Sequence, residues 1–313
     1  MTDLRSQLRG LWLPLITPFR NGELDNTSLR RLVRHYCTLP IDGLILAATT
    51  GEGLTLSAEE TAQLVAVVRD EATGIREALP ICLGLSGSDT RRLTDTLTRT
   101  AAWPIDGYLI SCPYYSRPTQ AGMIRHFGAL ADEATHPVMI YNIPYRTGVN
   151  LGNDAMLQLA EHPNIVGLKD CCAIRAQSVE LQRRRPARFA VLTGEDAQTY
   201  DALADGADGA ILASAHIETG AFASVVRLLA AGDRDAALIH WQTVSHLTKL
   251  LFSEPSPAPI KHWLWRIGLI DSPELRLPMT EVSPELAVRL DREIASRANA
   301  AATATAGAHF RSR

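Results

Sequence analysis

Eight short apolar segments recur along roughly the first three quarters of the chain, and each is followed by a stretch with helical periodicity. They start 20 to 38 residues apart, at Leu11, Gly43, Ile81, Gly107, Val138, Ile165, Phe189 and Gly209. The segments are apolar almost throughout, which is typical of parallel strands buried on both faces. Eight alternating strand and helix units predict a (β/α)8 TIM barrel, an α/β fold, with a doubly wound open sheet as the alternative. No G-x-G-x-x-G pattern or phosphate-binding loop follows any segment, which disfavours nucleotide binding.

The strand pattern stops near residue 232, where purely helical patterns begin. We expect the barrel to span residues 1–232 and a C-terminal helical extension, packed on the barrel, to span residues 233–300. The low-complexity tail over residues 301–313 is expected to be disordered. Within the barrel, one helix start is well marked, because Ser57 and Glu60 have the spacing of a capping box.

The composition excludes several classes of function. Hydrophobic residues make up 46% of the chain and charged residues 21%, which is ordinary for a globular protein with a packed core. The net charge of −3 offers no basic surface for nucleic acid. No apolar run approaches the ~20 residues of a transmembrane helix, and the first residues lack the apolar stretch of a secretory signal. We therefore expect a cytoplasmic protein without nucleic-acid or membrane partners.

Cysteine and histidine spacing argues against both a disulfide framework and a metal site. The five cysteines form no C-x-x-C pair, and the nine histidines are scattered without an H-E-x-x-H pattern. Free, buried thiols and no metal are the expectation.

Catalytic residues of a (β/α)8 barrel come from the carboxyl ends of its strands. Those positions give a short set of candidates: Thr49, Thr50, Gly51, Tyr115, Tyr141, Arg146, Lys169 and Ile211. The hydroxyl side chains among them can relay protons between a substrate and water. The turn at Thr50 and Gly51 offers backbone N–H groups to a carboxylate, and Arg146 can bind a second carboxylate through two hydrogen bonds.

Lys169 is notable because the chain has only three lysines, the others being Lys249 and Lys261, among 31 basic residues. It closes the apolar run NIVGLK, so we expect desolvation at the barrel mouth to disfavour its ammonium form. A neutral amine attacks a ketone and forms a Schiff base, whose protonated form withdraws electrons from the adjacent carbon. Such a lysine makes or breaks carbon–carbon bonds without a cofactor. The alternative is a lysine whose head group merely reaches solvent.

Six stretches carry a resemblance to a known family. They are TTGEG at 49–53, PYYSRPTQAG at 113–122, YNIPYRTG at 141–148, GLKD at 167–170, GED at 194–196 and EPSPAPIK at 254–261. In this order the chain resembles the dihydrodipicolinate synthase / N-acetylneuraminate lyase family of pyruvate-dependent Schiff-base lyases, over about residues 8–290. The resemblance implies a (β/α)8 barrel, a homotetramer or homodimer, and a covalent imine with pyruvate in place of a cofactor.

The resemblance also implies catalytic roles. Lys169 matches the lysine that forms the imine with pyruvate, and Tyr141 matches the tyrosine that moves protons at that imine. Thr49 and Tyr115 match the rest of the proton relay, with Tyr115 donated through a subunit contact.

The remaining candidates match substrate-binding positions. Thr50 and Gly51 match the site of the pyruvate carboxylate, and Ile211 matches the residue whose carbonyl lines the pyruvate pocket. Arg146 matches the arginine that, in the synthase branch, holds the carboxylate of aspartate semialdehyde. This favours a lyase that condenses pyruvate with aspartate semialdehyde, in diaminopimelate and lysine biosynthesis.

Departures from the synthase pattern keep the second substrate open. They are DCCA after Lys169, ASAH at 213–216, and CP in place of TP at 112–113. One alternative is a paralogous aldolase or dehydratase acting on a 2-keto-3-deoxy acid, a sialic acid or a hydroxyproline-derived substrate. Another, of a different class, is a non-catalytic barrel that binds a keto acid, although the intact set of candidates argues against it.

Regulation by lysine is common in the family, at a subunit interface near the helix that follows TTGE. At the matching positions, Ala58 and Thr61 stand where sensitive members often carry histidine. Ser88 and Arg92 stand where those members place an amide and a glutamate. Since Arg92 would repel the ammonium group of the ligand, we expect no inhibition by lysine.

Overall fold

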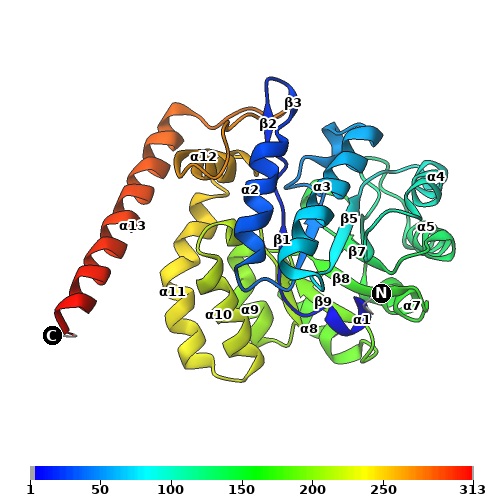
Figure 1. Cartoon of the computed structure of the whole chain (residues 1–313). Coiled ribbons are helices and arrows are strands. Elements are labelled where there is room, and N and C mark those ends of the chain that lie inside the picture. The colour runs from blue at the N-terminus through cyan, green and yellow to red at the C-terminus, as the bar shows by residue number, and fades with distance from the viewer. Residues whose placement is uncertain (1–3, 312–313) are drawn as a thin grey trace.

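The computed structural model describes the backbone of residues 4–311, and side chains over residues 4–300 apart from that of Arg5. At its centre eight parallel strands close into a barrel, in the order β1-β10-β9-β8-β7-β6-β5-β4 (Figure 1). The strands are β1 (Gly10–Pro14), β4 (Gly43–Leu46), β5 (Ile81–Leu85), β6 (Gly107–Ser111), β7 (Val138–Asn142), β8 (Ile165–Asp170), β9 (Ala190–Thr193) and β10 (Gly209–Ile211). The predicted (β/α)8 barrel is confirmed, and the open doubly wound sheet was the wrong alternative.

Helices surround the barrel and cover the outer faces of the strands (Figure 1). They are α2 (Asn26–Cys37), α3 (Ala58–Arg76), α4 (Thr90–Thr100), α5 (Gln120–Glu133), α7 (Asn153–Ala160), α8 (Arg175–Arg184), α9 (Thr199–Ala204) and α10 (Thr219–Ala230). The apolar stripe of α3, with Leu64, Val65 and Val68, is buried against the strands. Its first turn has the predicted capping box: Ser57 accepts from the backbone N–H of Glu60 (3.1 Å), and the Glu60 carboxylate accepts from the N–H of Ser57 (2.8 Å).

Short elements follow several strands at their carboxyl ends. They are the hairpin strands β2 (Phe19–Arg20) and β3 (Glu23–Leu24), the 3-10 turns η1 (Gly53–Thr55), η2 (Asp196–Gln198) and η3 (Ser214–His216), and the helix α6 (Pro144–Thr147). The hairpin was not predicted, because two-residue strands leave no hydrophobic period to detect.

The barrel interior is filled by apolar side chains, and its amino-terminal end is closed. Trp12 and Ile211, side by side on β1 and β10, lie in this interior core. Leu4, in the short helix α1 (Leu4–Gln7), and Leu8 just after it belong to the same core. The helix α1, which the sequence analysis did not predict, therefore closes the barrel at the amino-terminal ends of its strands.

The extension expected over residues 233–300 contains α11 (Arg234–Leu250), α12 (Ala258–Arg266) and the first part of α13 (Pro284–Arg311). Ile260 and Leu264 of α12 are fully buried, and Leu286 of α13 nearly so. The backbone of α13 continues as helix to Arg311, whereas the sequence suggested an irregular tail over residues 301–313. The disorder of that tail stays a prediction, since the side chains from residue 301 and all of residues 312–313 lie outside the described part.

Candidate active site

Tyr141 and Lys169 lie next to each other at the carboxyl ends of β7 and β8. The two residues are paired in the parallel register of these strands, so both side chains enter the barrel at the same level. The Lys169 ammonium nitrogen is 4.4 Å from the centroid of the Tyr141 ring. Only 5% of Lys169 and 6% of Tyr141 is exposed. The structure thus brings these two candidate residues together at the carboxyl end of the barrel.

A glycine makes room for the lysine. A Cβ atom on Gly194, directly after β9, would lie 2.3 Å from Cε of Lys169 and 2.6 Å from Sγ of Cys171. Such contacts are far too short, so the lysine chain occupies the space that a larger residue at 194 would fill. Sequence reasoning named the GED motif but missed this role of its glycine; the only available signal was a glycine at a strand end.

Burial dominates the electrostatics of Lys169. Desolvation lowers the pKa of its ammonium group, and the positive charge of Arg146 acts in the same direction. The carboxylates of Asp196 and Glu195 oppose this shift without cancelling it. The neighbouring Cys171 also acts against the shift, although burial raises the pKa of its own thiol.

The other acidic groups around the lysine are also held towards their neutral forms. Burial raises the pKa of the Tyr141 phenol well above its ordinary value, so Tyr141 is a proton-carrying hydroxyl at neutral pH. Burial, with the adjacent Asp196, raises the pKa of the Glu195 carboxyl. The shifts of the Lys169 amine and the Glu195 carboxyl bring their pKa values closer to neutral pH, while Tyr141 keeps its proton.

The turn after β4 contains the next candidates. Thr50 is 6% exposed, whereas Thr49 is exposed at the rim. The carbonyl of Gly51 accepts a hydrogen bond from the Thr17 hydroxyl (2.7 Å). A Cβ on Gly51 would lie 2.9 Å from the carbonyl oxygen of Leu15, so the turn packs closely against the loop after β1.

Arg146 is presented by the short helix α6, which starts with Pro144 directly after Ile143 and ends at Gly148 in the left-handed region (φ 77°). Its side chain is exposed, and its guanidinium carbon lies 5.8 Å from the ring centroid of Tyr145. Arg146 thus stands at the rim, above the deeper Lys169. That position fits a group that binds the outer part of a substrate.

Tyr115 is not brought to the lysine within one chain. It is 93% exposed, and its backbone is in the left-handed region (φ 69°), which is uncommon for a bulky residue. Its N–H donates to the carbonyl of Thr147 (3.2 Å), and the Ser88 hydroxyl donates to the carbonyl of the neighbouring Tyr114 (2.6 Å). The loop is therefore fixed while the Tyr115 side chain projects outward. Ile211, in contrast, is fully buried in the interior core that also contains Tyr141.

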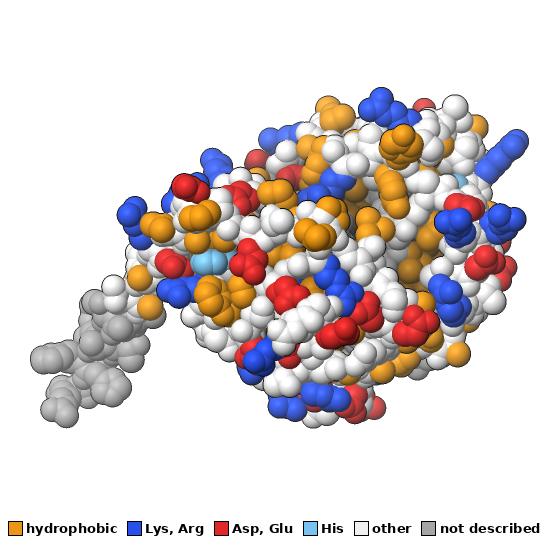
Figure 2. Space-filling model, turned by 90° about the horizontal axis from the view of Figure 1, so that it is seen from above, with side chains coloured by type: hydrophobic (Ala, Val, Ile, Leu, Met, Phe, Trp, Pro, Cys, Tyr) orange, Lys and Arg blue, Asp and Glu red, His pale blue; other side chains and the backbone are white. Residues whose placement is uncertain are grey.

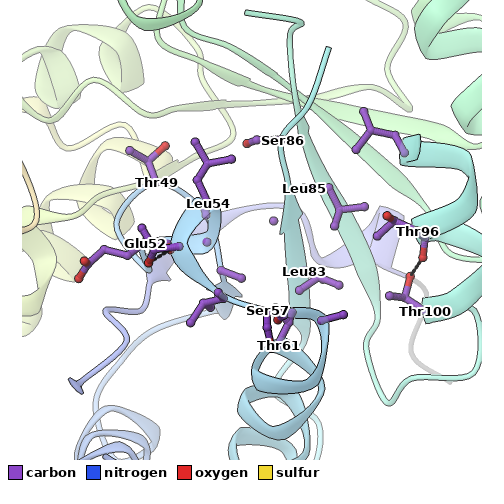
Figure 3. Close-up of a pocket in the computed structure, with 18 of the residues that line it drawn as sticks. Thr49, Glu52, Leu54, Ser57, Thr61, Leu83, Leu85, Ser86, Thr96 and Thr100 are labelled. Carbon is purple, nitrogen blue, oxygen red and sulfur yellow. Dashed lines mark hydrogen bonds between the residues drawn. The ribbon is translucent and has the colours of Figure 1, made fainter. Parts of the chain in front are cut away.

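A cavity of about 390 Å³ adjoins the site without containing it (Figure 3). It lies between the η1–α3 segment and the β5–α4 segment, and Leu54, Thr61 and Leu83 are among the side chains that line it. Of the candidate residues only Thr49 and Arg146 reach it. Lys169 and Tyr141 therefore lie outside this side cavity.

The face that carries the strand ends is partly apolar, and Figure 2 shows hydrophobic side chains gathered on it around a hollow. Leu54, in the turn after β4, is 71% exposed, and Tyr115, in the loop after β6, is 93% exposed. Among the described residues, no three His, Cys, Asp or Glu side chains are grouped as metal ligands would be. Over the same part of the chain, every helix is too short or too polar to cross a membrane.

A closed parallel barrel with a buried strand-end lysine beside a tyrosine defines a (β/α)8 protein of the kind that can form a Schiff base. The model of the dihydrodipicolinate synthetase family matches residues 7–296. The chain belongs to this family.

Individual relatives agree over almost the whole chain. A protein of Clostridium acetobutylicum named 4-hydroxy-tetrahydrodipicolinate synthase 2 is 40% identical, over 91% of this chain and 99% of its own. The crystal structure of dihydrodipicolinate synthase from Aquifex aeolicus superposes with a TM-score of 0.88 at 33% identity, covering 93% of this chain and 98% of that one. The chloride-inhibited enzyme of Acinetobacter baumannii, complexed with pyruvate, gives 0.88 at 32% identity, with 93% and 99% covered.

Proposed function

We propose that the protein is a lyase with 4-hydroxy-tetrahydrodipicolinate synthase-like activity, condensing pyruvate with aspartate semialdehyde through an imine on Lys169. The observation that carries the proposal is the desolvated amine of Lys169, paired in register with Tyr141 at the carboxyl end of a closed barrel. Relatives of this name, matched over nearly their whole length, support the choice of reaction.

The chemistry starts at the neutral amine. The Lys169 nitrogen adds to the ketone carbon of pyruvate, and loss of one water molecule leaves a protonated imine. Because the imine withdraws electrons, the methyl carbon of pyruvate gives up a proton and becomes an enamine nucleophile. That carbon then forms a bond to the aldehyde carbon of the second substrate, whose oxygen takes up a proton. The amino group that aspartate semialdehyde brings into the adduct then attacks the imine carbon, a ring closes through that nitrogen, and the Lys169 nitrogen takes up a proton and leaves as the free amine.

The surrounding groups receive matching roles. Tyr141, a neutral hydroxyl next to the amine, exchanges protons with the imine and the departing water. The backbone around Thr50 and Gly51 binds the pyruvate carboxylate. Arg146 at the rim binds the carboxylate of aspartate semialdehyde, because its exposed guanidinium suits a bidentate contact.

Reductive trapping tests the proposal. With pyruvate and borohydride, the protein should gain one reduced pyruvate adduct, located by peptide mass spectrometry at Lys169. Lys169→Ala should abolish the adduct, and so should Lys169→Arg, because a guanidinium cannot act as the amine. Lys249→Ala, which removes an exposed lysine on α11, is the matched control and should be trapped like the wild type. No adduct in the wild type, or one that persists in Lys169→Ala, would refute the mechanism.

The second substrate has its own assay. Arg146→Ala should raise KM for aspartate semialdehyde far more than KM for pyruvate, since a charged hydrogen-bonded contact is worth about 1.5–3 kcal/mol. If the wild type ignores aspartate semialdehyde but cleaves a 2-keto-3-deoxy acid, the paralogous aldolase takes its place.

The proposal also includes the assembly. We infer a homodimer or homotetramer in which Tyr115 reaches the site of a neighbouring copy, supported by its exposed and conformationally fixed position. Exposed Leu54 on the same face is compatible with such a contact. A cytoplasmic location, expected from the sequence, remains part of the proposal.

A further inference from the structure

Lys261, the last residue of the EPSPAPIK stretch, has no part in the chemistry above, yet it is one of the most deeply buried charges in the chain. It lies on α12 with 0% of its surface exposed. Its Nζ is 2.5 Å from a carboxylate oxygen of Glu52 and donates to the backbone carbonyl of Glu274 (2.8 Å). The same Nζ lies 4.3 Å from the ring centroid of Phe19, on the hairpin after β1. The ammonium group of Lys261 is therefore removed from water and held by partners from three separate segments.

Glu52, its partner, directly follows the Thr50-Gly51 turn. It is 5% exposed and has a left-handed backbone (φ 51°), a conformation that non-glycine residues hold only when their surroundings enforce it. One carboxylate oxygen pairs with Lys261, and the other accepts the backbone N–H of Arg276 (3.0 Å). Both oxygens of this carboxylate are therefore tied to the C-terminal extension.

Arg276 strengthens the same connection. Its guanidinium donates to the carbonyl of Thr55 (3.0 Å) in η1 and to that of Gly22 (2.6 Å) in the β2–β3 hairpin. It also pairs with the Glu60 carboxylate and lies 4.4 Å from the Phe19 ring centroid. The loop after α12 is thus bound to the η1–α3 segment that follows Glu52 and to the β2–β3 hairpin.

We propose that the buried Lys261–Glu52 ion pair is a positioning device, which holds the Thr50-Gly51 turn in the conformation that binds the substrate carboxylate. The extension is then part of the substrate site and not only a covering of the barrel. This inference rests on the proposed function, because it assumes that the turn binds the carboxylate of a keto acid.

Energetics favour a positioning role over one in net stability. A buried ion pair gains little over a well-packed apolar pair, because the desolvation of both charges offsets their attraction. The cost of desolvation is reflected in the pKa of Lys261. Burial lowers this pKa to about 8, although the charge of Glu52 acts in the opposite direction. What the pair does provide is a fixed place for the Glu52 carboxylate, and with it a fixed backbone next to Gly51.

The experiment measures pyruvate binding through the trapping of Lys169. The half-saturating pyruvate concentration for the borohydride-reduced adduct is determined for the wild type, Glu52→Gln, Lys261→Met and the double variant Glu52→Gln/Lys261→Met. We expect this concentration to rise about tenfold or more in Glu52→Gln and in the double variant, because small misplacements of a binding group have large effects. The yield at saturating pyruvate should approach that of the wild type. Lys249→Met, an exposed lysine replaced in the same way, is the control and should bind pyruvate normally.

The outcomes separate positioning from folding. Lys261→Met leaves a buried carboxylate unpaired and can unfold the protein. In that case the double variant, which removes both charges, tests the positioning role. Variants that fold, by circular dichroism, and trap pyruvate with the wild-type half-saturation overturn the inference. If the wild type itself forms no adduct, the proposed function fails, and this inference fails with it. Normal trapping in the wild type and unchanged binding in the variants overturn the positioning role alone.

Discussion

The ammonium group of Lys169 prefers water, yet it is held where strands and side chains exclude water. The chain tolerates this because the lowered pKa makes the neutral amine accessible, and because Asp196 and Glu195 partly compensate the charge of the ammonium form. Strand-end position and the scarcity of lysine were enough to single out this residue from the sequence. The contacts that shape its surroundings, from Gly194 and Cys171, come from another strand and from the following loop. No local pattern could have predicted those contacts.

The lowered pKa of Lys169 has a direct consequence for reactivity. A lysine amine is nucleophilic only in its neutral form, so a downward shift of its pKa from the ordinary value of about 10.4 raises the reactive fraction at pH 7–9. We expect arylation of Lys169 by fluorodinitrobenzene, followed by peptide mass spectrometry across pH 6–11, to show a midpoint below that ordinary value. The exposed Lys249 serves as the internal control for reagent stability. A midpoint for Lys169 at or above about 10.4 would contradict the role of burial.

Gly194→Ala tests the space around the lysine. The added Cβ would lie 2.3 Å from Cε of Lys169, so the lysine chain must move away from its place beside Tyr141. We expect kcat to fall by about tenfold or more and the free energy of unfolding to fall by about 1–3 kcal/mol. Gly220→Ala, on α10 with nothing near its Cβ position, should leave kcat unchanged. Wild-type kcat in Gly194→Ala would mean that the lysine is free to relocate.

At the scale of elements, the strands were predictable because a parallel barrel buries both faces of each strand and so leaves an uninterrupted apolar run. All eight predicted starts fall on a strand or one residue from its end. The β2–β3 hairpin and α1 were missed because they are too short to show a period. The pairing of Glu52 with Lys261 was beyond reach for a different reason, since it joins distant parts of the chain through tertiary packing alone.

The capping box of α3 is a prediction at this scale. Ser57→Ala removes the hydroxyl that accepts from the N–H of Glu60, which should lower the free energy of unfolding by about 1 kcal/mol in urea denaturation. The matched control is Ser224→Ala on α10, whose hydroxyl only bonds back to the carbonyl of Gly220 and caps nothing. That variant should change stability by less than about 0.5 kcal/mol. Equal losses in the two variants would exclude a capping contribution.

At the scale of the whole molecule, the exposed Tyr115 makes a prediction about assembly. Lys169→Ala and Tyr115→Phe should each be inactive or nearly so. If Tyr115 serves a neighbouring copy, a hybrid dimer of the two variants contains one intact site. Random reassociation of an equal mixture should then restore about a quarter of the wild-type activity. Continued inactivity, with hybrids verified by native mass spectrometry, would show that Tyr115 does not serve the site of a neighbouring copy.

Insensitivity to lysine is the second prediction at this scale. The charged residues lining the cavity beside Ala58 and Thr61 are Glu52, Arg99 and Arg146, and Glu52 is already paired with Lys261. No lining carboxylate is left to accept the ammonium groups of lysine, and the Arg92 charge on α4 is unfavourable as well. We expect millimolar lysine to leave the rate unchanged at neutral pH. Dose-dependent inhibition with a micromolar midpoint, lost in Thr61→Ala, would show that a lysine site has survived.

The helix α1 and the apolar side chains inside the barrel leave only the carboxyl end of the barrel open. Leu4 and Leu8 close its floor, so whatever reaches Lys169 must pass the rim where Arg146 stands. An aldehyde held at that rim would stand in the way of pyruvate travelling to the lysine below it. For the proposed reaction we therefore expect the keto acid to enter first and to lose its water through the open mouth, before the second reactant covers it. The closed and filled lower end of the barrel thus leads us to expect an ordered sequence of kinetic steps at the open end.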